Sequence, residues 1–333
     1  MGSVVLSVDA ELAWGFHDLT DPPGRRIRNA RWGWHQLLDV LEDYDVPATW
    51  AVVGHLLLES CDGRHADHPA AADGWFERDP GGSLERDDRW YGLDLVAAVR
   101  NARMEHEIGC HSFSHVVFDP ETDRDVVHAE LERCVSIAER HDLSLESFVF
   151  PRNVVGHRDA LAEYEFDCYR GVEPPRWYDD SRFRRLGKVA SFVAGRTPPP
   201  LVVPEIDEYG LVNVPASLSL FSFEGAARSV VEPFAGDPVV RQAKLGIDAA
   251  ASSDGICHFW LHPNDITSKR DVRRLRRIFA YIDARRRETE LRVETMADVA
   301  RRVSADEPTR PAEMADDETA AVHRSPSSPA GRH

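Results

Sequence analysis

Two histidines stand four residues apart in the segment 107–115, which reads EIGCHSFSH. His111 and His115 can point the same way if the chain turns helically between them. Neutral imidazoles at this spacing commonly hold a divalent metal ion, and a third ligand must then come from elsewhere in the chain. A pair of surface or core histidines without any ligand is the alternative, so the spacing alone leaves both interpretations open.

Carboxylates that could complete such a site follow the short apolar segment 3–8. Asp9 and Glu11 are separated by one residue, so both side chains lie on one side of the chain if the strand continues. In α/β folds the carboxyl ends of strands carry the functional sites. Acidic residues also cap the turns that follow strands, and this remains the alternative.

Other residues with useful chemistry follow later apolar segments. Arg152 and Asn153 come after residues 147–150, and His262 comes after residues 256–261. His258 precedes His262 by four residues and lies on the same face of a strand. It either enters the site or packs in the core. The tryptophans 14, 34, 177 and 260 could offer a surface on which a sugar stacks, with core packing as the alternative for each.

Short apolar strands alternate with amphipathic helices and must position these residues. We expect strands over 3–8, 48–53, 107–110, 147–150, 166–169, 211–214, 256–261 and 291–293. We expect helices over 27–44, 56–58, 93–104, 122–141, 157–164, 237–251, 269–287 and 295–303. About seven strand–helix units of this kind predict a parallel, barrel-like sheet.

The remaining segments are irregular in sequence. Residues 61–89 are dense in Asp, Gly, Pro and Arg, and we interpret them as a long excursion over the functional edge of the sheet. Residues 171–210 are rich in proline and arginine and are expected to form a helix and loops beside the barrel mouth. Residues 1–303 then form one domain, and 304–333 form an acidic tail rich in Pro, Ser and Ala that is expected to be disordered.

Composition limits the class of partner. The 333 residues carry a formal charge of −17, and only three of the 40 basic residues are lysines: Lys188, Lys244 and Lys269. An acidic surface argues against nucleic acid and anionic membranes as partners. The preference for arginine over lysine on such a surface resembles the proteins of salt-loving organisms, which predicts a halophilic archaeal source.

Five cysteines are scattered through the chain and never form a C-x-x-C pair. They are interpreted as small buried hydrophobic residues in a reducing compartment. The first strand begins almost at Met1, and no apolar run approaches the roughly 18 residues that a membrane span needs. We therefore expect a cytoplasmic protein without a membrane span.

The order of these motifs resembles the polysaccharide deacetylase (NodB-homology) family over most of residues 3–303. The segments that carry the resemblance are SVDA (7–10), HSFSH (111–115), FPRN (150–153) and FWLH (259–262). The form of the third motif, together with residues 9–15 and YRG (169–171), resembles the branch found in surface-glycan and lipopolysaccharide gene clusters. The resemblance implies a distorted seven-stranded (β/α) barrel. The family's fourth motif, an Asp that orients the catalytic His, has no assigned position here.

Roles for individual residues follow from the resemblance. Asp9 corresponds to the general base and His262 to the general acid, while Arg152 is expected to pair with Asp9 and to keep it ionised. His111 and His115 correspond to metal ligands. The family's metal-binding Asp is replaced by Ala10, so Glu11 is the candidate third ligand, with Asp9 as the alternative. Candidate substrate contacts are Trp14, Asn153, Arg170 and His258.

The implied activity is metal-dependent removal of an acyl group from an amino sugar in a nucleotide-linked or lipid-linked precursor, with acetyl as the first choice and formyl as the alternative. The expected cofactor is zinc, with cobalt, manganese or iron as other options. One alternative is hydrolysis of a cyclic amide or ureide, as in allantoinase-like relatives, where part of the branch is metal-independent. A catalytically inactive, glycan-binding barrel is the other alternative, because Ala10 replaces an acid.

Overall fold

A curled, mainly parallel sheet forms the centre of the molecule. The computed structural model describes residues 1–306 apart from 180–181, 183–186, 189 and 193–196. The strands of the main sheet are β1 (Ser3–Ala10), β2 (Thr49–Val52), β5 (Glu107–Cys110), β6 (Ser147–Val149), β7 (Cys168–Arg170), β8 (Glu205–Ile206), β9 (Val212–Asn213), β10 (Leu218–Ser219), β11 (Ile256–Leu261) and β12 (Arg292–Glu294). Their order is β10–β11–β1–β2–β5–β6–β7–β9–β8, and β12 pairs with the start of β1.

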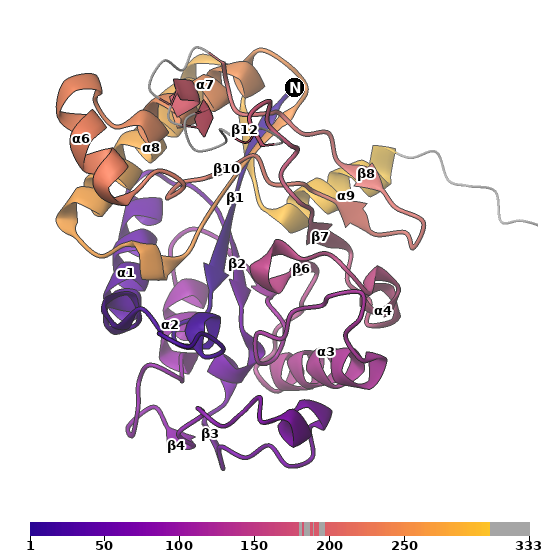
Figure 1. Ribbon diagram of the computed structural model, residues 1–333. Helices are drawn as coiled ribbons and strands as arrows, with labels where there is room; N and C mark the ends of the chain where they lie inside the picture. Colours follow the sequence, from indigo (N-terminus) through magenta and orange to yellow (C-terminus); the bar gives the residue numbers. More distant parts are fainter. Residues whose placement is uncertain (180–181, 183–186, 189, 193–196, 307–333) are drawn as a thin grey trace, which may run out of the picture.

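Strand β1 is the axis of this sheet (Figure 1). Every residue from Ser3 to Ala10 is buried. It pairs in parallel with β11 on one side and with β2 on the other, and β12 adds three further pairs at its start. A parallel strand covered on both faces needs a continuous apolar sequence, which explains the run VVLSV at 4–8.

Residues 212–220 close the curl between β7 and β11. At one end, the Val214 N–H donates to the Tyr169 carbonyl over 2.9 Å. Further on, the Ser217 N–H donates to the His258 carbonyl over 2.8 Å, and the Leu220 N–H donates to Trp260 over 2.9 Å. The segment thus contains β9 and β10, and it hydrogen-bonds to β7 at one end and to β11 at the other. The predicted distorted (β/α) barrel is confirmed.

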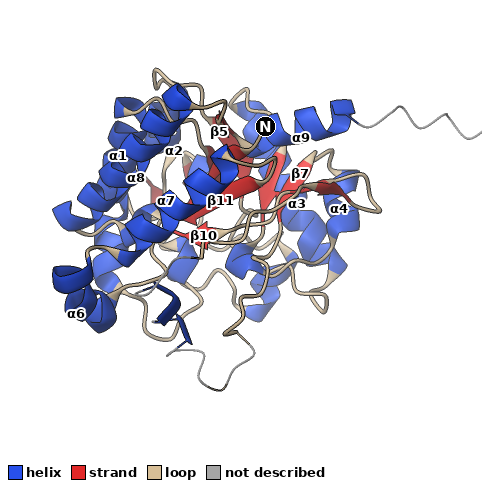
Figure 2. Cartoon of the chain, turned by 90° about the horizontal axis from the view of Figure 1, so that it is seen from above, coloured by secondary structure: helices blue, strands red, loops and turns tan. Residues whose placement is uncertain are grey.

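Helices surround the sheet, as Figure 2 shows. They are α1 (Gly24–Asp43), α2 (Leu93–Arg100), α3 (Arg124–Arg140), α4 (Arg158–Glu163), α6 (Gly225–Ala235), α7 (Pro238–Ala251), α8 (Lys269–Glu288) and α9 (Met296–Asp306). Asp123 caps α3 and Asp237 caps α7, each accepting a hydrogen bond from the backbone two residues later. In α1, the buried residues Trp34, Leu37 and Leu41 recur at helical spacing and face the core.

The region between β2 and α2 contains only short elements. It begins with the 3₁₀ turn Gly54–Leu57 and includes the two-residue hairpin strands β3 (Ser60–Cys61) and β4 (Gly82–Ser83). In Figure 1 this hairpin lies beyond the end toward which β1 points. The predicted excursion over the functional edge therefore matches the structure.

Among the strands and α-helices of the described residues, α6, the β3–β4 hairpin and the short strands β8 and β10 were not predicted from the sequence. Helix α9 continues to Asp306, beyond the predicted end at residue 303. The predicted disorder of the tail falls on residues 307–333, which lie outside the described residues. Within the described part of the chain, none of the helices is both long and apolar enough to cross a bilayer.

Candidate metal centre and catalytic residues

Polar side chains gather at the carboxyl ends of four strands. Strand β1 supplies Asp9 and leads into Glu11, while β5 leads into His111 and β11 leads into His262. The last residue of β7 is Arg170. In a parallel barrel these ends meet at one mouth, which explains how residues more than 250 positions apart in sequence come together.

His111, His115 and Glu11 form a buried group whose ligand atoms all lie within 4.8 Å of one another. The Oε2 atom of Glu11 is 3.1 Å from His115 Nε2 and 3.6 Å from His111 Nε2. Burial would raise the pKa of Glu11, but His262 and the two neighbouring histidines hold it well below its usual range. These three residues, predicted as metal ligands, are brought together as expected.

The donor set fits a divalent cation. His111 Nδ1 lies 2.7 Å from the Val149 carbonyl, which can only accept, so the ring proton sits on Nδ1. The Nε2 lone pair of His111 is therefore free and faces the Glu11 carboxylate. Two imidazoles and one carboxylate are a common set of protein ligands for catalytic zinc, which keeps a further position open.

Gly15 makes room for the Glu11 carboxylate. A Cβ atom at position 15 would lie 2.0 Å from Cδ and 2.0 Å from Oε1 of Glu11. Any larger side chain at this position would therefore push the carboxylate out of place. Leu12, between the two, has a left-handed φ of 46°, which non-glycine residues rarely adopt.

Asp9 is held by Arg170, and the predicted pairing of Asp9 with Arg152 is wrong. Arg170 donates from Nη1 to Asp9 Oδ1 over 2.5 Å and from Nη2 to Oδ2 over 2.7 Å. Burial would raise the pKa of Asp9, but the charge and hydrogen bonds of Arg170 hold it below its usual range. Arg170, predicted as a substrate contact, has no exposed side-chain surface and does not line the pocket.

Arg152 and Asn153 lie in a tight turn after β6. Both have left-handed backbone angles, with φ of 58° and 55°. This turn directs Arg152 across the mouth, where it donates to Asp18 over 2.6 Å and to the Gly15 carbonyl over 3.1 Å. Asn153 accepts a hydrogen bond from Arg170 over 2.8 Å. Asn153 therefore supports the arginine that holds Asp9, and it also lines the pocket.

His262 faces both carboxylates. Its Nε2 atom lies 3.6 Å from Asp9 Oδ2 and 3.8 Å from Glu11 Oε1. Its Nδ1 atom lies 3.1 Å from Oδ2 of Asp265. Burial would lower the pKa of His262, but the charges of Glu11, Asp265 and Asp9 raise it to about 10. The ring is therefore protonated at neutral pH.

Asp265 was missed by the sequence reasoning, which found no acid to orient His262. The signal was present in the segment HPND, because the 3₁₀ turn Pro263–Asp265 brings position 265 back to position 262. The other oxygen of Asp265 lies 3.0 Å from Arg26 Nη2. Gly33 of α1 lets that helix approach this turn, since a Cβ there would lie 2.1 Å from the Pro263 carbonyl oxygen.

Two predicted substrate contacts are instead buried. His258 has no exposed surface, and its Nε2 atom is 2.9 Å from the Ser7 hydroxyl, which itself accepts from Arg170 over 2.9 Å. Burial and then the charge of Arg170 lower the pKa of His258 to about 3, so the ring is neutral. Trp14 is also fully buried, with its ring centroid 4.4 Å from that of His55. Neither side chain reaches the pocket.

The pocket at this mouth has a volume of about 230 Å³. It is lined by the site residues Asp9, Glu11, His115 and His262 together with Gly15, Phe16, Arg26, Arg152, Asn153 and Trp260. Trp260 is thus the tryptophan of the predicted set that reaches the site. The guanidinium of Arg170 lies 4.9 Å from the centre of the Trp260 ring. The Nε1 atom of Trp260 donates to Glu173 over 2.9 Å.

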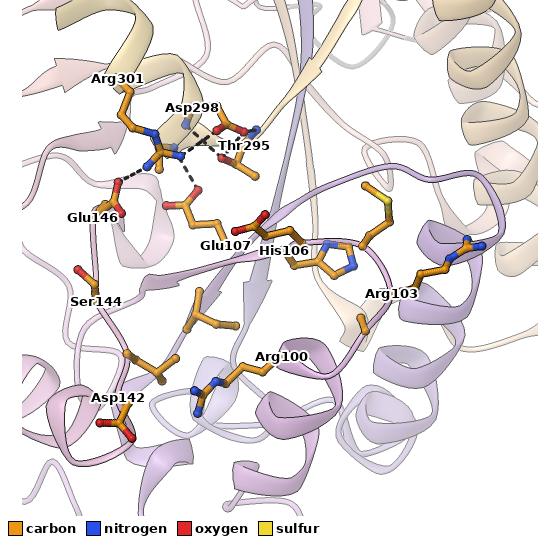
Figure 3. A pocket seen from close by; sticks show the side chains of 16 residues that line it. Arg100, Arg103, His106, Glu107, Asp142, Ser144, Glu146, Thr295, Asp298 and Arg301 are labelled. Atoms are coloured by element: carbon orange, nitrogen blue, oxygen red, sulfur yellow. Dashed lines mark hydrogen bonds and ion pairs between the residues drawn. The ribbon is translucent and has the colours of Figure 1, made fainter.

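A larger cavity of about 620 Å³ lies elsewhere, at the amino ends of the strands. Figure 3 shows its lining, with Glu107, Glu146 and Arg301 on one wall and Arg100 and Arg103 on the other side. Dashed lines mark the ion pair between Arg301 and Glu146. In barrels of this kind the amino ends serve stability, so size does not make this cavity the active site.

Comparison with known proteins agrees with this site. Residues 28–153 match the family model described as polysaccharide deacetylase. This segment contains His111, His115 and Arg152, whereas Asp9, Glu11 and His262 lie outside it. None of the curated proteins compared with the chain matches it.

Solved structures share the fold over nearly the whole chain. A putative polysaccharide deacetylase from Mycobacterium smegmatis aligns with 17% identity and a TM-score of 0.58, covering 93% of this chain and 94% of its own. PuuE allantoinase aligns with 15% identity and a TM-score of 0.56, covering 92% of this chain and 91% of its own. A probable polysaccharide deacetylase from Pseudomonas aeruginosa PAO1 aligns with 15% identity and a TM-score of 0.54, covering 92% of each chain. Residues 28–153 are thus similar to the polysaccharide deacetylase family, and the chain shares the fold of these solved structures.

Proposed function

We propose that this site removes an N-acyl group, in the first place acetyl, from an amino sugar in a metal-dependent reaction. The observation that carries the proposal is the position of Glu11. Its carboxylate faces His111 and His115 and so restores the acidic ligand that Ala10 cannot provide. The base–acid pair Asp9 and His262 lies beside this group, with 3.6 Å between Oδ2 and Nε2.

Glu11, His111 and His115 would hold the cation, with zinc as the first choice for this donor set. When bound, a divalent cation lowers the pKa of a water molecule and polarises the acyl carbonyl group. The remaining chemistry falls to the side chains of this chain. Because His111 keeps its proton on Nδ1, the ligand nitrogen is available without a change of tautomer.

Asp9 would accept a proton from the attacking water as the new carbon–oxygen bond forms. Arg170 keeps Asp9 ionised and fixes its direction through two parallel hydrogen bonds. His262 would give its Nε2 proton to the sugar nitrogen as the carbon–nitrogen bond breaks, since an unprotonated amine is a poor leaving group. Asp265 orients the ring and stabilises its protonated form. The products are acetate and the free amino sugar.

The size of the pocket supports a single sugar unit as the reacting group. Its volume of about 230 Å³ is below the roughly 300–1,000 Å³ of drug-sized sites. A second cavity of about 410 Å³ shares Asn153 and Trp260 as lining residues, and Lys188 also lines it. Arg26 and Arg152 lie on the pocket wall. These features support a sugar attached to a phosphate-containing carrier, nucleotide or lipid, of the kind used to build surface glycans.

The proposal is tested by measuring acetate release from a panel of N-acetyl amino sugars, either free or linked to nucleotide or lipid phosphates. We expect release by the purified chain, loss after chelation, and recovery when zinc is added back. His115→Ala should be inactive, whereas His128→Ala, on α3 and outside the site, should match the wild type. Metal-independent opening of a cyclic ureide would instead favour an allantoinase-like enzyme. Saturable sugar binding without turnover would indicate an inactive barrel.

A further inference from the structure

Outside the catalytic mouth, three side chains converge on one carboxylate oxygen of a fourth residue, Asp79. Oδ2 of Asp79 lies 3.0 Å from His55 Nε2, 2.8 Å from His65 Nε2 and 3.2 Å from Cys61 Sγ. The ligand atoms of all four residues lie within 4.8 Å of one another. The side chains of His55 and Asp79 have no exposed surface, and His65 is 5% exposed. The region between β2 and α2 thus folds around this group.

The orientation of His55 points to a missing positive charge. Its Nδ1 atom lies 3.4 Å from the Trp90 carbonyl, which can only accept, so the ring proton belongs on Nδ1. Nε2 then carries only a lone pair, and it lies 3.0 Å from Oδ2 of Asp79, which is also an acceptor. Among the described residues, this buried Nε2 atom has no hydrogen-bond partner. Two acceptors held 3.0 Å apart in the interior are stabilised when a cation binds both.

The donor types fit a structural metal ion. Two neutral imidazoles, one thiolate and one carboxylate balance the charge of a divalent cation. Nitrogen and sulfur ligands together favour zinc over magnesium or calcium, which prefer oxygen. With four protein ligands the coordination sphere is complete, which is typical of structural and not of catalytic zinc sites.

We propose that His55, Cys61, His65 and Asp79 form a second, structural site for a divalent metal ion of the zinc class. This group is called the hairpin site below, because β3 contains Cys61 and β4 follows shortly after Asp79. No step of the proposed deacetylation uses it.

The hairpin site would brace the loop that carries the catalytic histidines. The Gly54 N–H donates to the Ser112 carbonyl and the His55 N–H donates to the Phe113 carbonyl, each over 2.8 Å. His55 therefore belongs to the turn that holds the backbone between His111 and His115. The region 54–92 has no long helix or strand of its own, and metal coordination would supply the folding free energy that a larger core provides elsewhere.

A metal-free hydrogen-bond network centred on Asp79 is the competing explanation. Oδ1 of Asp79 accepts from the Gly81 N–H over 3.0 Å, and Oδ2 is within reach of His65 and Cys61. Such a network could persist without any cation. It leaves Nε2 of His55 without a partner, and it predicts that Cys61 carries a free thiol under all metal conditions.

Metal analysis of the full chain separates the two explanations. After metal removal and refilling with Zn²⁺, we expect about two equivalents per chain, one for each of the two sites of this type. His115→Ala should lose about one equivalent, and Cys61→Ser should lose the other. Cys257→Ser is the matched control, since this buried cysteine of β11 lies outside both groups and its removal should leave the metal content unchanged.

Cobalt substitution reports on the hairpin site alone, because the catalytic ligands include no sulfur. The Co²⁺ protein should show a cobalt–thiolate charge-transfer band in the near ultraviolet. The band should persist in His115→Ala and Cys257→Ser and disappear in Cys61→Ser. Should Cys61→Ser fail to fold, alkylation of the wild type gives the answer, with Zn²⁺ slowing modification of Cys61 at least about tenfold. Absence of the band in wild type, or an alkylation rate unchanged by Zn²⁺, would overturn the proposal.

Discussion

Asp9 and Glu11 show how two carboxylates in nearly adjacent positions take different partners. Asp9 still belongs to β1 and meets Arg170 of β7 across the barrel, whereas Glu11 lies past the strand end and meets the two histidines. Arg170 therefore compensates the charge of Asp9, while the neighbouring histidines stabilise the charge of Glu11. This separation keeps both acids ionised although they are buried, which a base and a ligand working together require.

Arg170 and Arg152 can be distinguished by mutation. Arg170→Lys keeps a positive charge but loses the bidentate contact with Asp9, so we expect kcat to fall about 10²-fold with metal content unchanged. Arg152→Lys is the matched control and should alter kcat by less than about fivefold, because Arg152 contacts Asp18 and the backbone of Gly15. Both are measured by acetate release at saturating substrate. An equal loss in the two variants would restore Arg152 as the partner of Asp9.

Gly15 provides a test of the ligand role of Glu11 that leaves Glu11 itself in place. Gly15→Ala inserts a methyl group into the space of the carboxylate, so we expect the metal dissociation constant to rise about 10- to 100-fold. Gly24→Ala, at the start of α1, meets only the flexible end of Arg28 and should bind metal normally. Competition with a metal-binding dye gives both constants. Wild-type affinity in Gly15→Ala would mean that Glu11 is not a ligand.

At the scale of elements, the sequence predicted most strands and helices because their patterns are regular. The buried run of β1 and the helical spacing of Trp34, Leu37 and Leu41 in α1 are set by local sequence. The hairpin β3–β4 was missed because each strand has only two residues and no alternation to detect. Its geometry depends on contacts between distant residues such as Cys61 and Asp79.

The sequence pattern also could not predict which arginine pairs with Asp9. Both Arg152 and Arg170 follow buried segments, and no spacing rule states which one reaches across the barrel. The left-handed turn at residues 152–153 decides this by turning Arg152 toward Asp18. The motif order located the site, but the pairing within it depends on backbone conformation that the sequence pattern does not encode.

The start of α8 offers an element-level prediction. Asp271 accepts hydrogen bonds from Ser268 over 2.7 Å and from Arg228 of α6 over 2.8 Å. Asp271→Asn breaks a buried ion pair, so we expect the free energy of unfolding at pH 7 to fall by about 3 kcal/mol. Glu288→Gln at the end of α8 is the control, because its side chain is 63% exposed, and it should cost less than about 1 kcal/mol. Urea titration followed by circular dichroism measures both.

The pH dependence of Asp271→Asn has a defined sign. Burial would raise the pKa of Asp271, but hydrogen bonds from Ser268 and Arg228 lower it below 3.8. The stabilisation by Asp271 is therefore present above that pH and is lost as the pH falls through the pKa of the folded state. The difference between wild type and Asp271→Asn should shrink as the pH approaches and passes below 3.8. A difference that stays constant or widens there would contradict the charged pair.

For the whole molecule, the charge of −17 predicts a response to salt. Repulsion among carboxylates should weaken the fold in dilute buffer, and salt should relieve it, since the screening length falls from about 30 Å at 0.01 M to about 3 Å at 1 M. We expect the Tm to rise from low to molar KCl. Calorimetry with the metal content held constant measures this. A Tm that stays flat or falls would remove the case for a salt-loving source.

The central claim is that Glu11 binds the metal while Asp9 acts as the base. The most direct test measures bound metal and acetate release together in Glu11→Ala and Asp9→Asn. We expect Glu11→Ala to be metal-poor, and Asp9→Asn to be metal-replete but slower by about 10² to 10⁴. Asn at position 9 keeps the volume and can still accept a hydrogen bond from Arg170. The opposite pattern would exchange the two roles, and full metal content with full turnover in both variants would contradict the account of the site.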